Sequence, residues 1–208
     1  MIVKTVPVTQ YLTTNTYFYI DEKSGHGWII DPAAEADKLL QIIFENNWNI
    51  ESILLTHGHF DHIGAVQKIA DTLQIPYLIN HNGNQYLSNP QFNLSAMTPE
   101  PITLENALYL KDDDIITLKV NPQICLQVIS TPGHTLDGAI YYDKSNALAF
   151  VGDTIFKDSY GATHFPGGDF AQLMNSIKNK ILTLPEETRL YPGHEAATSV
   201  KHEENNFK

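Results

Sequence analysis

The chain alternates between short apolar runs, which are typical of buried strands, and apolar residues at helical spacing. In its first part this pattern predicts three strands, a helix and a fourth strand, at residues 2–8, 16–21, 27–31, 33–46 and 51–55 in that order. We expect a turn at Thr13-Thr14-Asn15 and a helix start at Asp31-Pro32. Asp31 ends an apolar strand, where it can either orient a ligand histidine or cap the helix.

The later part of the chain shows the same two patterns around one long polar segment. Residues 81–105 are rich in Asn, Pro and Ser, which predicts a loop with one helical turn near residues 85–88 and a candidate lid over a site. Strands are predicted near residues 77–79, 115–119, 124–130, 138–143, 147–151 and 189–191. Helices are predicted after residue 62, near residues 170–182 and from about residue 195.

Composition narrows the class of protein. The 208 residues are 42% hydrophobic, enough for one sizeable core, so we expect a single domain over 1–208. No apolar stretch approaches membrane-spanning length and the N-terminus reads as a strand, which predicts a cytoplasmic protein without a membrane partner. A net charge of −11 with Arg189 as the only arginine argues against nucleic acid. Cys125 is the only cysteine, which excludes an internal disulfide.

One short segment concentrates potential metal ligands between a predicted strand and a helix. Residues 55–64 read Leu-Thr-His-Gly-His-Phe-Asp-His-Ile-Gly, so His57, His59, Asp61 and His62 fall within six positions. We expect Gly58 to let the backbone bend tightly between the first two imidazoles. His57 and His59 can then share one metal ion and leave the other two side chains for a second. A solvated polar turn is the alternative interpretation.

Three later segments end a predicted strand on a further potential ligand. His134 follows Thr131-Pro-Gly, Asp153 follows Phe150-Val-Gly, and His194 follows Tyr191-Pro-Gly. Taken singly, each is more often a hydrogen-bonded turn, but together with the first cluster they favour a metal site. Imidazoles and carboxylates without a nearby thiolate suit two divalent ions, with zinc as the first choice and iron or manganese as alternatives.

In this order, and together with Phe165-Pro-Gly-Gly-Asp169, these motifs resemble the metallo-β-lactamase superfamily and, within it, the glyoxalase II-like (hydroxyacylglutathione hydrolase-like) hydrolases. The resemblance implies an α/β (α+β) protein, a four-layer αββα sandwich with the metals at one edge between two sheets. It implies two ions with three ligands each and one bridging carboxylate, distributed as His57, His59 and His134, as Asp61, His62 and His194, and Asp153 between them. Asp61 and Asp153 are expected to be catalytic as well as metal-binding.

Two positions depart from the pattern of this branch. A basic residue that contacts glutathione usually follows the bridging aspartate at the position that is Ala162 here. His164 stands where an aromatic or acidic residue is usual. Because only residues 195–208 follow His194, we do not expect the helical domain with which glyoxalase II holds glutathione. These departures argue against glutathione specificity.

The sequence therefore predicts a binuclear metal-dependent hydrolase of a small thioester or activated ester, with a metal-bridging hydroxide as nucleophile. The alternative is a mononuclear iron oxygenase similar to persulfide dioxygenases, with a facial triad of His57, His134 and Asp153. Gly193 favours the hydrolase, because the oxygenases tend to have alanine there. A structural or sensor metal domain is a third hypothesis, which an open bridging position disfavours.

Overall fold

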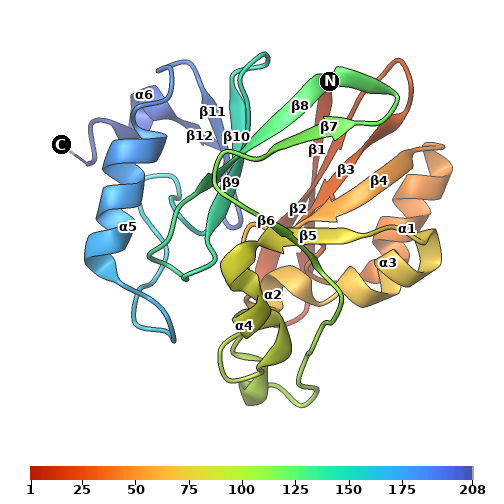
Figure 1. Cartoon of the computed structure of the whole chain (residues 1–208), viewed down its shortest axis with the longest axis horizontal. Helices are drawn as coiled ribbons and strands as arrows, with labels where there is room; N and C mark the ends of the chain where they lie inside the picture. The colour runs from red at the N-terminus through yellow and green to blue at the C-terminus, as the bar shows by residue number, and fades with distance from the viewer. Residues whose placement is uncertain (208) are drawn as a thin grey trace.

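Two six-stranded sheets face each other, and helices cover the outer face of each (Figure 1). The structure is a computed structural model that describes residues 1–207. Helices α1 (Ala36–Glu45) and α3 (Val66–Leu73) lie outside the first sheet, and α5 (Phe170–Ser176) lies outside the second. The layers therefore run helix, sheet, sheet, helix, which confirms the predicted αββα sandwich.

The chain builds the two sheets one after the other. The first contains, in spatial order, β1 (Ile2–Thr9), β2 (Thr13–Ile20), β3 (His26–Ile30), β4 (Asn49–Leu54), β5 (Tyr77–Asn80) and β6 (Leu108–Leu110). The second contains β12 (Thr198–Ser199), β11 (Arg189–Pro192), β10 (Leu148–Gly152), β9 (Ala139–Asp143), β8 (Asn121–Ser130) and β7 (Ile115–Leu118). The pairs β3–β4, β4–β5, β5–β6 and β10–β11 are parallel and the others antiparallel.

Shorter helices occupy the connections. Helix α2 (Phe60–Ile63) follows β4 directly, α4 (Asn84–Ser88) lies in the long polar segment, and α6 (Val200–Glu203) follows β12. Two single 3₁₀ turns, η1 (His81–Gly83) and η2 (Ser95–Met97), flank α4, and α5 continues as a π-helical turn, η3 (Ile177–Ile181). The predicted loop with one helical turn is thus confirmed, while the helix predicted after residue 62 is broken into two pieces.

The alternation of side chains along each strand produces the layers. In β2, Tyr17 and Tyr19 pack between the sheets, whereas Phe18 and Ile20 pack toward α1 and α3. In β10, Phe150 lies in the central layer and its neighbours pack toward α5. Strands buried on both faces explain the near-continuous apolar runs of the sequence.

Several predicted boundaries are wrong. Residues Thr13–Asn15 belong to β2, so the turn lies before them. Helix α1 begins at Ala36, several residues after Pro32, and the last helix begins at Val200 rather than near residue 195. The short strands β6 and β12 were not predicted, because three and two residues carry too little pattern. Within residues 1–207, no helix is both long and apolar enough to cross a membrane.

Candidate metal centre

Seven side chains meet at one edge of the sandwich, on the loops that follow β4, β8, β10 and β11. Strand β4 belongs to the first sheet and the other three to the second, so both sheets contribute to the same point. These seven are all of the predicted site residues, namely His57, His59, Asp61, His62, His134, Asp153 and His194.

The first group comprises His57, His59 and His134, whose candidate ligand atoms lie within 4.8 Å of one another. All three side chains are buried. His134 Nε2 lies 3.0 Å from His59 Nδ1. The second group comprises Asp61, His62 and His194. In it His194 Nε2 lies 3.3 Å and His62 Nε2 4.0 Å from Asp61 Oδ2.

Asp153 lies between the two groups. Its Oδ2 is 3.7 Å from His134 Nε2 of the first group and 3.3 Å from His194 Nε2 of the second. Its Oδ1 is 3.3 Å from His62 Nε2. One carboxylate therefore faces ligand atoms of both groups, as a bridging ligand must.

The donor atoms fit divalent cations. Among residues 1–207, His57 Nε2, His62 Nε2 and Asp153 Oδ1 are buried at the cluster without a hydrogen-bond partner. Three such atoms at one place are costly unless a further group satisfies them, because buried polar atoms are nearly always paired. Imidazole nitrogens and carboxylate oxygens are ligands of zinc and of iron or manganese. The chemistry of the cluster thus fits the two ions expected from the sequence.

Hydrogen bonds on the far side of the imidazoles fix their orientation. His62 Nδ1 donates to Asp31 Oδ2 at 2.9 Å, His134 Nδ1 donates to the Ala162 carbonyl at 2.6 Å, and His194 Nδ1 donates to the Thr13 carbonyl at 2.8 Å. Each bond leaves Nε2 free toward the cluster, which is the usual arrangement around ligand histidines.

Asp31 is the centre of this supporting shell. Its carboxylate also accepts the Thr56 backbone N–H at 2.8 Å and the Thr56 hydroxyl at 2.6 Å. Because that hydroxyl donates to Asp31, it accepts from His57 Nδ1 at 3.2 Å. The residue that precedes α1 is Glu35, so of the two interpretations of Asp31 the orienting one is correct.

Charge separates the two groups of histidines. Burial lowers the pKa of His57 well below its ordinary value and lowers that of His59 to about 3. For His62, burial acts against the charged form, but Asp153 and Asp31 outweigh it and raise the pKa. Burial opposes the charged form of His194 as well, and hydrogen bonds to Asp153 and Asp61 raise its pKa to about 10. The histidines of the first group are therefore neutral near pH 8, whereas the charged form is favoured at His62 and His194.

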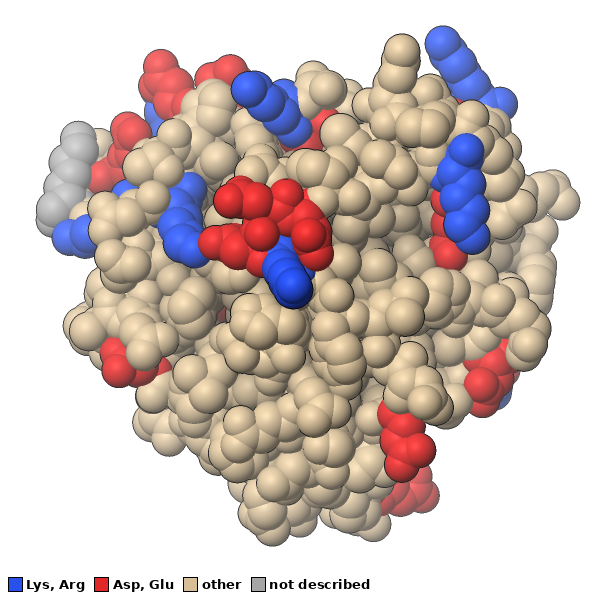
Figure 2. Space-filling view, viewed as in Figure 1, with Lys and Arg blue, Asp and Glu red and all other residues tan. Residues whose placement is uncertain are grey.

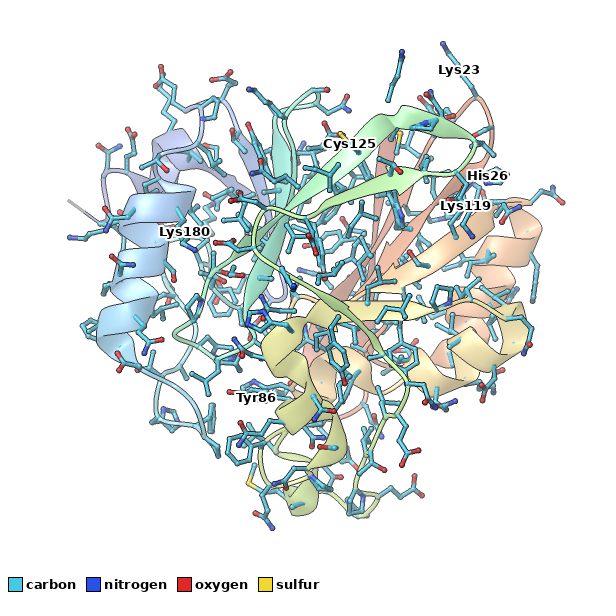
Figure 3. The ribbon with its side chains drawn as sticks, viewed as in Figure 1. Lys23, His26, Tyr86, Lys119, Cys125 and Lys180 are labelled. Atoms are coloured by element: carbon cyan, nitrogen blue, oxygen red, sulfur yellow. The ribbon has the colours of Figure 1, made fainter. Side chains whose placement is uncertain are left out.

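Tyr86 is a supporting residue that sequence reasoning missed. It comes from α4, it is fully buried, and its hydroxyl accepts the Leu136 N–H at 2.9 Å and donates to the Pro166 carbonyl at 3.1 Å (Figure 3). A Cβ on Gly58 would lie 2.5 Å from Tyr86 Cβ, and Gly58 does not have a positive φ. Glycine is thus needed for this close approach to Tyr86 and not for a left-handed backbone conformation.

A cavity of about 440 Å³ opens over the cluster. Metal-ligand candidates form its floor, and mostly apolar side chains form its walls: Tyr11, Leu12, Phe60, Leu94, Met97, Phe156, Ala162 and Phe165. Leu94 and Met97 belong to the long polar segment, so part of the predicted lid does border the site. His164 is absent from the lining, and its ring lies 4.1 Å from that of Phe165.

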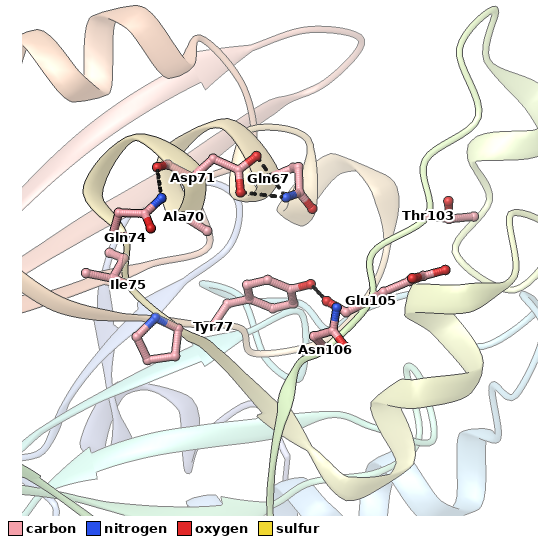
Figure 4. Close-up of a pocket in the computed structure, with 10 residues that line it drawn as sticks. Gln67, Ala70, Asp71, Gln74, Ile75, Tyr77, Thr103, Glu105 and Asn106 are labelled. Carbon is pink, nitrogen blue, oxygen red and sulfur yellow. Dashed lines mark hydrogen bonds between the residues drawn. The ribbon is translucent and has the colours of Figure 1, made fainter.

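Two other features offer polar side chains away from this site. A hollow of about 560 Å³ beside α3 contains Gln67, Asp71 and Tyr77, whose polar groups bond to one another or to nearby carbonyls (Figure 4). Near the C-terminus, His202 Nε2 lies 2.7 Å from Asp158 Oδ1, and the buried Glu203 accepts the Thr198 hydroxyl at 2.5 Å. The first bond ties α6 to the loop after Asp153 and the second ties it to β12, so His202 is more than the solvated surface residue that its position suggests.

Comparison with known sequences identifies the family. The pattern described as "Metallo-beta-lactamase superfamily" matches residues 11–194, a range that contains all seven site residues. The chain belongs to the metallo-β-lactamase superfamily. Members of this superfamily are usually metal-dependent hydrolases. A relative named probable metallo-hydrolase YqgX, from Bacillus subtilis, is 35% identical over 93% of this chain and 90% of its own. One named hydroxyacylglutathione hydrolase GloC, from Haemophilus influenzae, is 29% identical over 98% and 95%.

Solved structures of the superfamily superpose over nearly the whole chain. BLEG-1 B3 metallo-β-lactamase has a TM-score of 0.91 and 34% identity and covers 98% of this chain and 97% of its own. TTHA1623, solved in a di-iron-bound form, has a TM-score of 0.84 and 30% identity over 97% and 98%. ETHE1 from Myxococcus xanthus has a TM-score of 0.78 and 27% identity over 100% and 83%. The resemblance to glyoxalase II-like members is consistent with the GloC relative, while the substrate differs among these names.

Proposed function

We propose that this protein is a binuclear metal-dependent hydrolase of a small thioester or activated ester. His57, His59 and His134 hold one ion, Asp61, His62 and His194 hold the other, and Asp153 bridges them. The observation that carries this proposal is the place of Asp153, whose Oδ2 lies within 3.7 Å of His134 Nε2 and 3.3 Å of His194 Nε2. A site for a single ion would not require the second set of three ligands, Asp61, His62 and His194.

The reaction requires no nucleophile from the chain itself. When bound, two divalent ions supply a hydroxide at neutral pH and polarise the carbonyl that it attacks. Hydrolysis joins the oxygen of water to the acyl carbon and breaks the carbon–sulfur or carbon–oxygen bond. One proton of the water leaves as the hydroxide forms, and the other ends on the leaving group or in solvent. Asp61 and Asp153 are the carboxylates that line the cavity, so as ligands they would place the ions and accept hydrogen bonds from the attacking water.

The bond from His134 Nδ1 to the Ala162 carbonyl has a further consequence for the reaction. This bond fixes the orientation of the His134 ring over the cavity. Because its acceptor is an uncharged carbonyl, His134 Nε2 keeps the metal-binding strength of an ordinary neutral imidazole. His62 differs, because its Nδ1 bonds to the carboxylate of Asp31. The bond to a carboxylate makes Nε2 of His62 the more electron-rich ligand atom of the two, for the ion that His62 would help to hold.

Gly193 favours the hydrolase over the one-iron oxygenase. A Cβ at this position would lie 2.3 Å from Asp153 Oδ1 and 2.5 Å from His62 Cε1. The backbone cannot retreat, because Gly193 donates to the Gly152 carbonyl at 2.9 Å and accepts from Asn15 at 2.7 Å. Glycine thus leaves room for the bridge and for the second group. Alanine, which the oxygenases tend to have here, would remove that room.

Small molecules are the proposed substrates, and nucleic acid is not a proposed partner. Figure 2 shows lysine and arginine side chains scattered among acidic ones on one face, without a continuous basic patch. The net charge of −11 supports the same conclusion, because tracking a phosphate backbone needs clustered positive charge.

Metal content and turnover test the proposed function together. Protein purified without added metal should contain about two divalent ions per chain and should hydrolyse a neutral thioester, with activity lost on chelation and restored by zinc, iron or manganese. Asp153→Ala should lower the occupancy of both ions, whereas His194→Ala should lower mainly one. About one iron per chain with oxygen uptake would support the oxygenase instead. Full two-ion binding by an active Asp153→Ala protein would exclude the bridge.

A further inference from the structure

We propose that the substrate is neutral and apolar on both sides of the bond that is broken, so that this protein hydrolyses apolar acyl thioesters or esters. This inference rests on the proposed hydrolase function and deepens it by naming the substrate class. It is carried by the walls and the mouth of the cavity over the candidate metal centre.

The walls come from four separate parts of the chain. Tyr11 and Leu12 lie in the turn between β1 and β2, Phe60 begins α2, Leu94 and Met97 lie around η2, and Phe156, Ala162 and Phe165 belong to the loop after Asp153. None of the eight carries a charge. A cavity of about 440 Å³ is within the usual range for small-molecule sites, which are mostly apolar with a few polar groups at the reacting end.

The mouth of the cavity exposes large apolar side chains to water. Met97 is 73% exposed, Leu12 54% and Tyr11 48%. The Tyr11 ring is held edge-on against Phe60, with ring centroids 5.9 Å apart. Three such residues around one opening form an exposed apolar patch, and patches of this kind mark places where an apolar group is bound.

Apolar side chains flank both halves of the metal centre. The Phe165 ring lies 5.8 Å from that of His59 in the first group, and the Phe156 ring lies 5.8 Å from that of His194 in the second. A carbonyl placed between the two groups therefore has an aromatic wall on either side. This is why the inference covers the acyl group and the leaving group alike.

The charges that line the cavity leave an anionic substrate without a partner. Asp61 and Asp153 are the charged residues of its lining other than histidines, and the residues that line it include no lysine or arginine. Both carboxylates belong to the proposed metal centre, where bound ions would offset their charge, so an anionic group away from the reacting carbonyl has no cationic side chain to pair with. A missing hydrogen bond to a charged group lowers kcat/KM by roughly tenfold to a hundredfold.

Three thioesters test the inference, and each anionic probe shares one half with the neutral probe. The neutral probe is S-phenylacetyl-N-acetylcysteamine, the anionic-acyl probe is S-succinyl-N-acetylcysteamine, and the anionic-thiol probe is S-phenylacetyl-thioglycolate. We expect kcat/KM of the metal-loaded protein for the neutral probe to exceed that for each anionic probe by at least about tenfold. Equal values, or a preference for an anionic probe, would overturn the substrate class while leaving the hydrolase function standing. Failure to hydrolyse any of the three would overturn the proposed function itself.

Variants at the mouth of the cavity test which residues produce the preference for the neutral probe. Leu12→Ser and Met97→Ser should each lower kcat/KM for the neutral probe by about three- to tenfold, because part of the apolar contact is lost, and should change it less than twofold for the succinyl probe. Leu108→Ser is the matched control, since Leu108 is 53% exposed on β6 and lies outside the cavity lining. Changes of equal size in all three variants would contradict the proposed role of the mouth.

Binding of a compound that cannot react gives a second readout. S-(2-phenylethyl)-N-acetylcysteamine lacks the carbonyl, so its affinity measured by calorimetry reports the walls alone. We expect Leu12→Ser to weaken its binding about three- to tenfold and Leu108→Ser to leave it unchanged. Absence of binding to the unsubstituted protein, or unchanged binding to Leu12→Ser, would overturn the inference.

Discussion

Asp31 Oδ2 lies 2.9 Å from His62 Nδ1, although Asp31 follows β3 and His62 lies in α2, and both residues are buried. The same carboxylate also accepts from Thr56, which stands next to His57. Asp31 itself has a φ of 47°, a left-handed conformation that Asp and Asn tolerate better than most residues. A strained backbone position thus supports one histidine of each group.

Replacing this carboxylate should weaken metal binding. Asp31→Asn keeps the backbone conformation but loses an acceptor, so affinity for the second ion should fall about 10–100-fold, as it does for other supporting groups of ligand histidines. Competition with a chelator measures the affinity. Asp21→Asn is the control, because Asp21 also accepts side-chain and backbone hydrogen bonds, from Ser24 in the turn after β2, and is not one of the candidate ligands or their partners. An unchanged affinity in Asp31→Asn would show that the bond to His62 does not position the ligand.

The seven candidate ligands could be predicted from the sequence because each follows a strand end that its own neighbours define. Asp153, for instance, comes directly after the apolar run of β10. The supporting residues could not be predicted in this way. Tyr86 lies in a polar segment with no local pattern, and its role depends on the Pro166 carbonyl, eighty positions away. Only tertiary contacts reveal such a residue.

The predicted start of the first helix was wrong for a related reason. Asp31-Pro32 has the composition of a helix start, yet the Asp31 carboxylate is already engaged by Thr56 and His62. The Pro32 carbonyl accepts from Ala65 instead of joining a helix, and α1 begins only at Ala36. Contacts at the candidate site thus override the helix start that the local sequence predicts, as is expected at functional positions.

Gly193→Ala should convert a two-ion site into a one-ion site. The added methyl group would collide with Asp153 Oδ1 and His62 Cε1, and hydrogen bonds hold the backbone on both sides. We expect metal content to fall from about two ions toward one and kcat for a neutral thioester to fall at least about tenfold. Elemental analysis and turnover measure both quantities, and the thermal melt shows whether the variant is folded. A folded variant that keeps two ions would refute this role of Gly193.

Binding of the two ions should release protons unequally. At pH 8 the histidines of the first group are neutral, whereas His62 and His194 are protonated in the metal-free protein, with the pKa of His194 raised to about 10. Because ligand histidines must be neutral, the ligands of the first ion should release almost no proton and those of the second close to two, in addition to the proton that is lost where bound water becomes hydroxide. Affinity for the second ion should therefore rise with pH up to about 10.

Calorimetry in two buffers of different ionisation enthalpy counts these protons. His194→Ala should lower the count for the second ion by about one. The raised pKa of His194 also stabilises the metal-free fold below about pH 6.5, and this stabilisation should disappear as the pH rises through about 10. Equal proton release for both ions would contradict the assigned charges.

Asp137→Asn should stabilise the protein at alkaline pH. Asp137 is fully buried, and burial raises its pKa to about 7 even though Thr135 and the Gly58 backbone hydrogen-bond to its carboxylate. A raised carboxyl pKa favours the folded state below the unfolded value of about 3.9, and this advantage declines until the pH reaches about 7. Relative to the unsubstituted protein, the variant should gain about 2–3 kcal/mol between pH 5 and pH 8.

Urea unfolding of both proteins at the two pH values measures this gain, and the comparison cancels the contribution of the metal ligands. Asp37→Asn is the control, because the Asp37 side chain is 86% exposed and its ion pair with Lys68 contributes little. The prediction fails if the Asp137→Asn protein differs from the unsubstituted one by the same amount at pH 5 and pH 8.

Ala162→Arg should restore recognition of a glutathione thioester. The Ala162 side chain lines the cavity while its carbonyl accepts from His134, and the substitution leaves that backbone bond in place. A new charged hydrogen bond to a glutathione carboxylate should raise kcat/KM for S-lactoylglutathione by roughly tenfold to a hundredfold and leave a small neutral thioester nearly unchanged. Ala162→Leu is the control, because it adds bulk without charge and should not favour the anionic substrate. An equal gain in the Ala162→Leu variant would contradict the prediction that the missing charge limits recognition of glutathione. So would an unsubstituted protein whose kcat/KM for S-lactoylglutathione is already near the diffusional ceiling of about 10⁸ M⁻¹s⁻¹.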